Sequence, residues 1–197
     1  TAAIVLGGGT DALVAAHLLA RGGRRVTLLT GGLTPRDTED GWVPTQAAGE
    51  LGVEVRLTWP DPWASVLLEG GGTLDLWQDM GRTVESLRRF SPRDADRWPD
   101  FCRRMALLAG VFAQLYVEPP LNPLDLRMAL RVRRLGRQGM EDLMRGLPMP
   151  VAELLDDWFE CDALKGALGA MATLHLQQGP RSAGTAFRLL HHHAGSP

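Results

Sequence analysis

The sequence of 197 residues has little cysteine and no excess of charge of either sign. Its two cysteines, Cys102 and Cys161, stand in apolar segments of helical pattern, which favours free buried thiols in a reducing compartment over a disulfide framework. The formal net charge is -2, so the basic excess that nucleic-acid binding requires is missing. We therefore expect a cytoplasmic protein without a nucleic-acid partner.

Long hydrophobic runs are also missing. No stretch reaches the roughly 18 consecutive apolar residues of a membrane span, and the first expected strand begins almost at residue 1, which leaves no room for a signal peptide. Glycine and β-branched residues are frequent in the first third, whereas Leu, Ala, Arg and Met dominate the rest. This shift predicts a boundary near Trp59-Pro60, with one region over 1–58 and a second over 59–197.

Strand and helix patterns alternate over the first 30 residues. The apolar run 2–6 ends in glycines 7–9, as expected of a parallel strand that is covered on both faces. Residues 11–21 have helical spacing, and 26–29 are again β-prone. A strand, a helix and a strand within about 30 residues predict a right-handed βαβ crossover unit, so the expected fold class is α/β.

Short strands and then helices follow. Residues 53–57, 65–68 and 73–77 have strand patterns, and glycines 70–72 join the last two; together they predict a small β-meander. Ser91-Pro92 is a typical helix start. Helices are expected over 44–51, 81–90, from 92 to the prolines at 119–120, and over 124–134, 138–145, 151–159, 164–176 and 182–192.

The motif Gly7-x-Gly9-x-x-Ala12 stands where the first strand ends and the first helix begins, a context that indicates a pyrophosphate site. Gly7 permits the tight turn, and Gly9 lets the backbone approach the phosphates. Ala12 keeps the helix close to the strand, while the helix dipole favours negative charge. The alternative is an α/β protein that uses the glycines for a turn alone. We favour the nucleotide site, formed first by Gly7, Gly8, Gly9, Thr10, Asp11 and Ala12.

The second part of such a site is an acidic residue at the end of the second strand, which binds the ribose. Thr30 stands there instead, followed by Gly31. One neutral hydroxyl in place of two carboxylate oxygens should weaken ribose binding by about 1–3 kcal/mol. Three interpretations stay open: Glu39, Asp40 or water restores the contact, Arg36 accepts a 2′-phosphate so that NADP is the cofactor, or binding has been lost.

With these motifs in place, the chain resembles the phytoene-desaturase-like FAD oxidoreductases. In that group the glycine turn runs Gly-x-Gly-x-x-Gly-Leu before alanines, as residues 7–16 nearly do. Later segments are similar to the substrate-domain region of the group, in the same order: Ser91-Pro92-x-Asp94-Ala95, 154–160 and Gly179-Pro180-Arg181-Ser182.

The resemblance implies a Rossmann-like FAD-binding unit over 1–58, followed by the β-meander and a mainly helical substrate-domain region. It also implies flavin-dependent dehydrogenation or desaturation of a small apolar substrate. No catalytic acid or base is assigned, because the flavin performs the chemistry.

The chain departs from the group at three places. Thr30 replaces an acid, the pair Gly31-Gly32 follows it directly, and 33–50 are shortened. Members of the group are also longer, and they return to the first domain at their carboxyl end to complete the flavin site. We therefore expect a truncated or incomplete chain, or a subunit of a split enzyme whose second chain supplies the missing half. The alternatives are a cofactor-poor pseudoenzyme and an NADP-dependent reductase.

Two further patterns have plainer explanations. Arginines alternate with apolar residues over 126–137, so this segment could lie on an anionic membrane, peripheral to it. We favour a solvated helix whose arginine stems cover a core. His191 to His193 are adjacent, so on a helix they point in different directions and are not expected to bind a metal.

Overall fold

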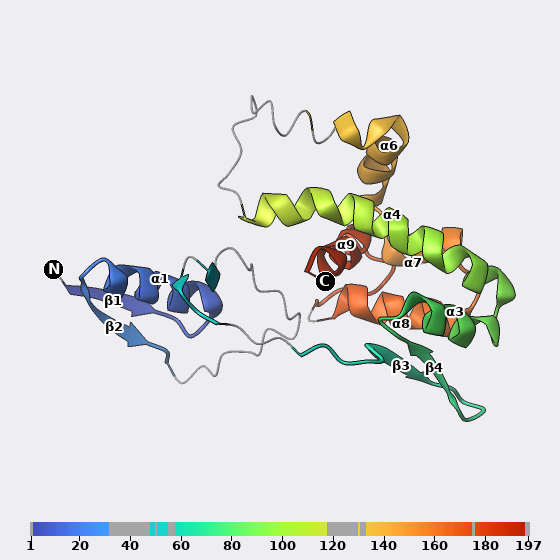
Figure 1. The fold of residues 1–197 in the computed structure, drawn as a ribbon, viewed down its shortest axis with the longest axis horizontal. Coiled ribbons are helices and arrows are strands. Elements are labelled where there is room, and N and C mark those ends of the chain that lie inside the picture. Colours follow the sequence, from blue (N-terminus) through green and yellow to red (C-terminus); the bar gives the residue numbers. More distant parts are fainter. Residues whose placement is uncertain are drawn as a thin grey trace. The chain divides into compact units, whose positions relative to one another are not determined.

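The computed structural model describes residues 2–31, 48–49, 51–54, 58–117, 130, 133–174 and 176–195. The chain divides into two compact units, Thr1–Leu57 and Thr58–Pro197, called here the amino-terminal unit and the helical unit. Helices dominate and the sheets are small, so the fold is α/β (Figure 1). Within the part of the chain that is described, no helix is both long and apolar enough to cross a membrane.

The amino-terminal unit contains strand β1 (Ala2–Leu6), helix α1 (Thr10–Arg21) and strand β2 (Arg25–Leu29). The strands are parallel, and Leu6 pairs with Leu29 at their carboxyl ends. These three elements begin within one residue of their predicted positions. Helix α1 packs against both strands.

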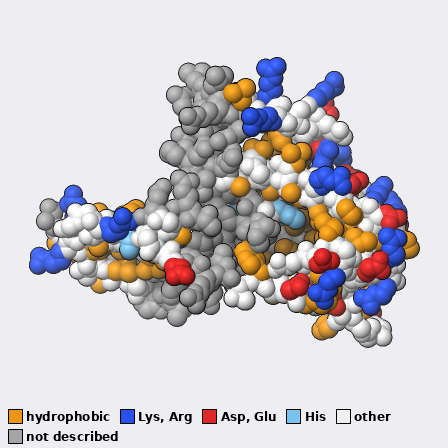
Figure 2. Space-filling model, viewed as in Figure 1, with side chains coloured by type: hydrophobic (Ala, Val, Ile, Leu, Met, Phe, Trp, Pro, Cys, Tyr) orange, Lys and Arg blue, Asp and Glu red, His pale blue; other side chains and the backbone are white. Residues whose placement is uncertain are grey.

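One prediction for this unit is wrong: the strands are not covered on both faces. Along each strand, half-buried residues alternate with exposed ones, and Ile4, Leu6 and Leu29 are 70%, 75% and 50% exposed. A single helix can cover one face of a two-stranded sheet, and among the described residues nothing shields the other. Figure 2 shows hydrophobic side chains on the surface of this unit.

The helical unit begins with a hairpin of β3 (Ala64–Leu67) and β4 (Thr73–Leu76), which are antiparallel. Gly71 and Gly72 have φ of +83° and +90°, a conformation that favours glycine in the loop. The predicted three-stranded meander is wrong at Val53 and Glu54, which are not in a strand. The rest of that predicted strand, 55–57, lies outside the described residues.

Helices follow the hairpin, close to the predicted ranges. Predicted helix 164–176 ends early, because Leu174 leaves the helical conformation with ψ of 130°. The predicted helices 44–51 and 124–134 lie largely outside the described residues, as does half of the arginine-rich segment 126–137. The helices are α3 (Met80–Arg88), α4 (Pro92–Val117), α6 (Gly136–Gly146), α7 (Val151–Trp158), α8 (Asp162–Thr173) and α9 (Thr185–Gly195).

The core of the helical unit lies between α4, α7, α8, α9 and the hairpin. Phe101, Met105 and Leu108 recur at helical spacing along α4 and form its buried stripe, since each is at most 3% exposed. The Phe101 ring lies 4.9 Å from that of Phe159 and 5.5 Å from that of Trp158, in edge-to-face geometry. Such pairs add to the free energy gained by burial alone.

Candidate functional site

The glycine turn of the amino-terminal unit is fixed by one contact and one torsion angle. The Gly7 amide donates to the Leu29 carbonyl oxygen at 2.9 Å, and Gly7 has φ of +134°. A Cβ at Gly7 would lie 3.1 Å from the Cβ of Ala12. Glycine at position 7 is therefore required both by the backbone and by the close approach of α1.

Gly9 is different, because the local fold does not require it. It caps the amino end of α1 with φ of -79° and ψ of 171°, a conformation open to any residue. No described atom lies within 4 Å of the position that its Cβ would take. The missing side chain therefore leaves open space at the start of the helix, which suits a ligand that must approach the backbone closely.

The first turn of α1 adds hydrogen-bond donors beside this space. The first α1 bond runs from the Leu13 amide to the Gly9 carbonyl oxygen at 3.1 Å, so the amides of Thr10, Asp11 and Ala12 precede the helical hydrogen-bond ladder. These amides and the helix dipole favour an anion. Asp11 also lies in this turn and is exposed, and its carboxylate opposes an anion if it turns toward the site.

Thr30 and Gly31 follow β2 at the same edge of the sheet. The pairing of Leu6 with Leu29 brings the carboxyl ends of both strands together, and parallel sheets bind ligands outside this edge. Thr30 is exposed, and Gly31 has φ of +62°. The turn residues therefore fit a pyrophosphate, whereas Thr30 offers one neutral hydroxyl where an acidic residue would bind a ribose. Arg36, Glu39 and Asp40, named as alternatives, lie outside the described residues.

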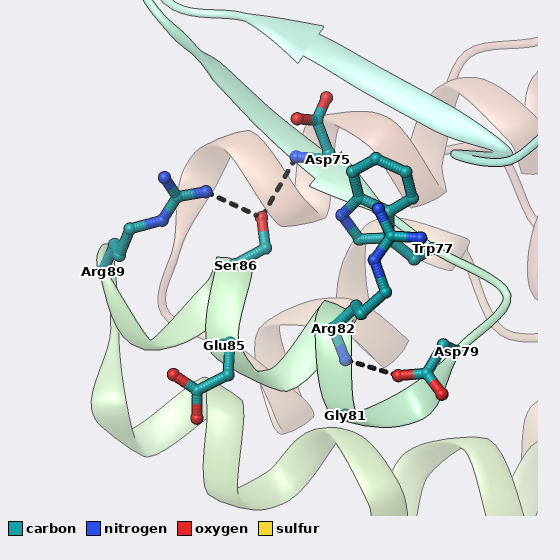
Figure 3. A pocket seen from close by; sticks show the side chains of 8 residues that line it. All are labelled: Asp75, Trp77, Asp79, Gly81, Arg82, Glu85, Ser86 and Arg89. Atoms are coloured by element: carbon teal, nitrogen blue, oxygen red, sulfur yellow. Dashed lines mark hydrogen bonds between the residues drawn. The ribbon is translucent and has the colours of Figure 1, made fainter.

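The helical unit has a shallow groove of about 590 Å³ between β4 and α3, which sequence analysis missed. The Arg82 guanidinium lies 3.4 Å from the centre of the Trp77 ring, and the Ser86 hydroxyl accepts from the Asp75 amide and from Arg89 (Figure 3). Its polar groups therefore mostly bind one another. The available signal was the recurrence of polar residues at helical spacing along α3: Arg82, Glu85, Ser86 and Arg89.

The downstream segments that carry the family resemblance form joints between helices. The Asp94 carboxylate accepts from the Glu160 amide at 3.1 Å and from the Cys161 amide at 2.8 Å. The Ser91 hydroxyl donates to Glu160 at 2.8 Å, so the segments around 91–95 and 154–160 meet. At the third segment, the Pro180 carbonyl oxygen accepts from the Ala152 amide at 3.0 Å. These residues position helices, and their contacts place none of them in a reactive site.

Four titratable side chains of the helical unit have displaced pKa values, and hydrogen bonds to Asp156 and Asp162 raise that of Lys165. Hydrogen bonds from Arg93 and Ser91 lower the pKa of the exposed Glu160. Burial raises the pKa of the Cys102 thiol to about 12, so this free cysteine is not a nucleophile at neutral pH. Burial, with a smaller contribution from His192, lowers the pKa of His193 to about 4. Among the described residues, no group of three or more metal-ligating side chains occurs.

Comparisons with known proteins agree with the oxidoreductase interpretation only in general terms. No protein-family model matches the chain. The chain is 26% identical, over 98% of its length, to the Rattus norvegicus protein named "Pyridine nucleotide-disulfide oxidoreductase domain-containing protein 2", and 25% identical, over 98%, to the Mus musculus protein of that name. It spans 41% of the length of each relative. The chain is therefore distantly similar to proteins named for an oxidoreductase domain.

Proposed function

We propose that this chain belongs to an FAD-dependent oxidoreductase that resembles the phytoene-desaturase-like group and acts on a small apolar substrate. The amino-terminal unit is its Rossmann-like flavin-binding part, and the helical unit belongs to its substrate domain. The observation that carries the proposal is the open space at Gly9, directly before the first turn of α1. The cofactor-binding residues are Gly7, Gly8, Gly9, Thr10, Asp11, Ala12, Thr30 and Gly31.

Each part of this edge has a role in holding the cofactor. The amides of the first turn of α1 bind the pyrophosphate, and Gly9 allows it to approach. Gly7 holds α1 close to β1, which fixes the direction of those amides. The Thr30 hydroxyl binds the ribose. FAD, when bound, supplies the redox chemistry.

The exposed sheet face supports the proposal that further polypeptide packs on this unit. Ile4 and Leu6 are 70% and 75% exposed, because α1 covers only one face of this two-stranded sheet. Adjacent exposed apolar side chains of this kind mark an interaction surface. We propose that further polypeptide covers this face and completes the flavin site, either in the same protein, since the relatives are longer, or in a second chain.

The NADP-dependent reductase remains a second candidate, and the observation that favours it is Thr30. An acidic residue at this position repels a 2′-phosphate, whereas the exposed neutral hydroxyl of Thr30 does not. The cofactor-poor pseudoenzyme differs from both candidates because it binds neither nucleotide. One titration with each cofactor separates the three.

The experiment is a visible absorption spectrum of the purified protein after incubation with FAD and gel filtration. Flavin bands that co-elute with the protein are the expected result. Gly9→Ala should weaken binding by about tenfold or more, a difference of about 1.4 kcal/mol, because its Cβ fills the space for the pyrophosphate. The matched control is Gly49→Ala, where a Cβ also meets no described atom within 4 Å, and it should bind FAD as the wild type does.

A colourless wild-type protein would overturn the proposal. So would FAD binding that Gly9→Ala leaves unchanged, since the flavin would then lie elsewhere. Circular dichroism of each variant shows that the helices have formed, which separates a lost site from a lost fold.

A further inference from the structure

A second cavity, of about 240 Å³ and partly open to solvent, lies in the helical unit between α4, α6, α7 and α9. Much of its wall is apolar: Met105 and Leu108 come from α4, Leu154 and Trp158 from α7, and Leu190 from α9. Met105, Leu108 and Leu190 are at most 3% exposed, so the wall belongs to the packed core. None of the residues of the glycine turn contributes to it.

The polar part of the lining is electrically balanced. Arg104 of α4 forms an ion pair with Asp142 of α6, and Arg145 of α6 forms one with Asp157 of α7 at 3.0 Å. All four side chains line the cavity. A charged ligand would bring an unpaired charge next to apolar side chains, or would have to displace one of these partners. An uncharged ligand avoids both costs.

Helix α6 covers the cavity with few apolar contacts. Only Gly139 and Leu143 of this helix are buried, and the Arg145–Asp157 pair that joins it to α7 is mostly exposed. Helix α6 begins and ends at glycines, Gly136 and Gly146. Segments with few buried apolar contacts open locally more readily than the core, which provides a route into the cavity.

We propose that this cavity binds a small uncharged molecule with an apolar body and one hydrogen-bonding group, such as a short-chain alcohol. Because one water occupies about 30 Å³ in the liquid, the cavity has room for about eight groups of that size. The Gln138 side chain also lines it, and its amide both donates and accepts hydrogen bonds. The assignment is independent of flavin binding, since the two sites share no residue.

The test compares 1-hexanol with hexanoate, which have the same chain length and differ in charge. Each is titrated into the full chain by isothermal calorimetry. We expect saturable binding of 1-hexanol at one site. Hexanoate should bind at least about tenfold more weakly, because its carboxylate would lie beside charged side chains that are already paired with one another. Equal affinity for the two would overturn the proposal, as would the absence of saturable hexanol binding.

Two glycines provide matched variants that locate the binding. Gly146 lines the cavity, and a Cβ there would meet no described atom within 4 Å, so Gly146→Leu extends into free space and should abolish hexanol binding. Gly146→Ala should weaken it less. Gly166 of α8 is exposed and equally unobstructed, and Gly166→Leu should bind as the wild type does.

All three substitutions replace glycine in a helix by a better helix former, so circular dichroism should show that the helices have formed. Wild-type affinity in Gly146→Leu would overturn the assignment to this cavity. The flavin spectrum is recorded on the same variants and should not change, so failure of this proposal is distinguishable from failure of the oxidoreductase proposal.

Discussion

The two units differ in where their apolar side chains lie. Among the described residues, every side chain of the buried hydrophobic core belongs to the helical unit. The amino-terminal unit instead exposes Ile4, Leu6 and Leu29 on one face of its sheet. The helical unit is therefore stabilised by its own core, whereas the proposed cofactor turn lies on the unit that buries less. Cofactor binding and a covering polypeptide should therefore stabilise the amino-terminal unit more than the helical unit.

The largest expected difference between the units comes from truncating one apolar side chain in each. Phe101 is fully buried against Trp98, Trp158 and Phe159, and Phe101→Ala should lower the free energy of unfolding of the helical unit by about 3–5 kcal/mol. Leu6 is 75% exposed, and Leu6→Ala should change stability by less than about 0.5 kcal/mol. Hydrogen exchange followed by mass spectrometry resolves the peptides of each unit.

If Phe101→Ala lowered the protection of backbone amides from exchange in both units, the two units would unfold as one, and the expected difference between them would be wrong. A large loss in Leu6→Ala would show that the β1 face is covered in solution, for instance by a second copy of the chain. Measuring Leu6→Ala at several protein concentrations separates that case from a monomer.

The second prediction concerns the joint that orders the helical unit. Asp94 is fully buried, and its carboxylate accepts from the amides of Glu160 and Cys161. Asp94→Ala leaves both amides at the start of α8 without this acceptor and should cost about 2–3 kcal/mol of unfolding free energy. Asp96→Ala, two residues after Asp94 on α4, removes an exposed carboxylate bound to Arg88 and should cost less than about 1 kcal/mol.

Urea unfolding followed by circular dichroism measures both variants. Similar costs for Asp94→Ala and Asp96→Ala would mean that the joint is not what holds α8 against α4. A cost confined to Asp94→Ala would support the view that the family-like segments 91–95 and 154–160 are kept for structure.

The sequence predicts elements whose signals are local, and it misses contacts between distant segments. The glycine turn and the Ser91 helix start follow from residue types and short spacings, and the structure has them. The joint between Asp94 and Glu160 joins residues 66 positions apart, which no short pattern encodes. The open β1 face was missed because an apolar strand has the same pattern whether its cover is present or not.

The glycine turn and the cavity under α6 differ in how far their residues lie apart in the sequence. The role of Gly7 depends on its own torsion angle and on Ala12, five residues away, so it could be predicted from the motif. The cavity under α6 requires four helices to be placed together, and its polar residues, spread from 104 to 157, have no spacing that would link them in advance.

The third prediction uses pH to perturb the helical unit through one residue of α9. Burial lowers the pKa of His193 from 6.5 to about 4, so below pH 6.5 the unfolded chain binds a proton that the folded chain does not. The contribution of neutral His193 to the free energy of unfolding is present above pH 6.5 and is lost as the pH falls toward 4. The loss is about 2 kcal/mol between pH 7 and pH 5. The measurement is urea unfolding at both values.

His193→Gln should remove most of that pH dependence, because glutamine does not titrate. The comparison of the two proteins cancels the contribution of the carboxylates. An unchanged pH dependence in His193→Gln would show that another group causes it. The amino-terminal unit should show no such difference in hydrogen exchange, which would keep the effect within the helical unit.

The smallest expected effect is on nucleotide binding by the amino-terminal unit. Thr30 is exposed at the carboxyl end of β2, and Thr30→Glu restores the acid that a ribose diol prefers. It should strengthen FAD binding by about tenfold, or about 1.4 kcal/mol, and weaken NADPH binding, because a carboxylate repels the 2′-phosphate.

Thr30→Val is the matched control, since it keeps the shape of the side chain and removes the hydroxyl, and it should weaken the binding of both nucleotides. Fluorescence titration with each nucleotide measures the four affinities. Stronger NADPH binding in Thr30→Glu would contradict the assignment of Thr30 to the ribose, and a change in protection of the helical unit would mean that the site is not confined to the amino-terminal unit.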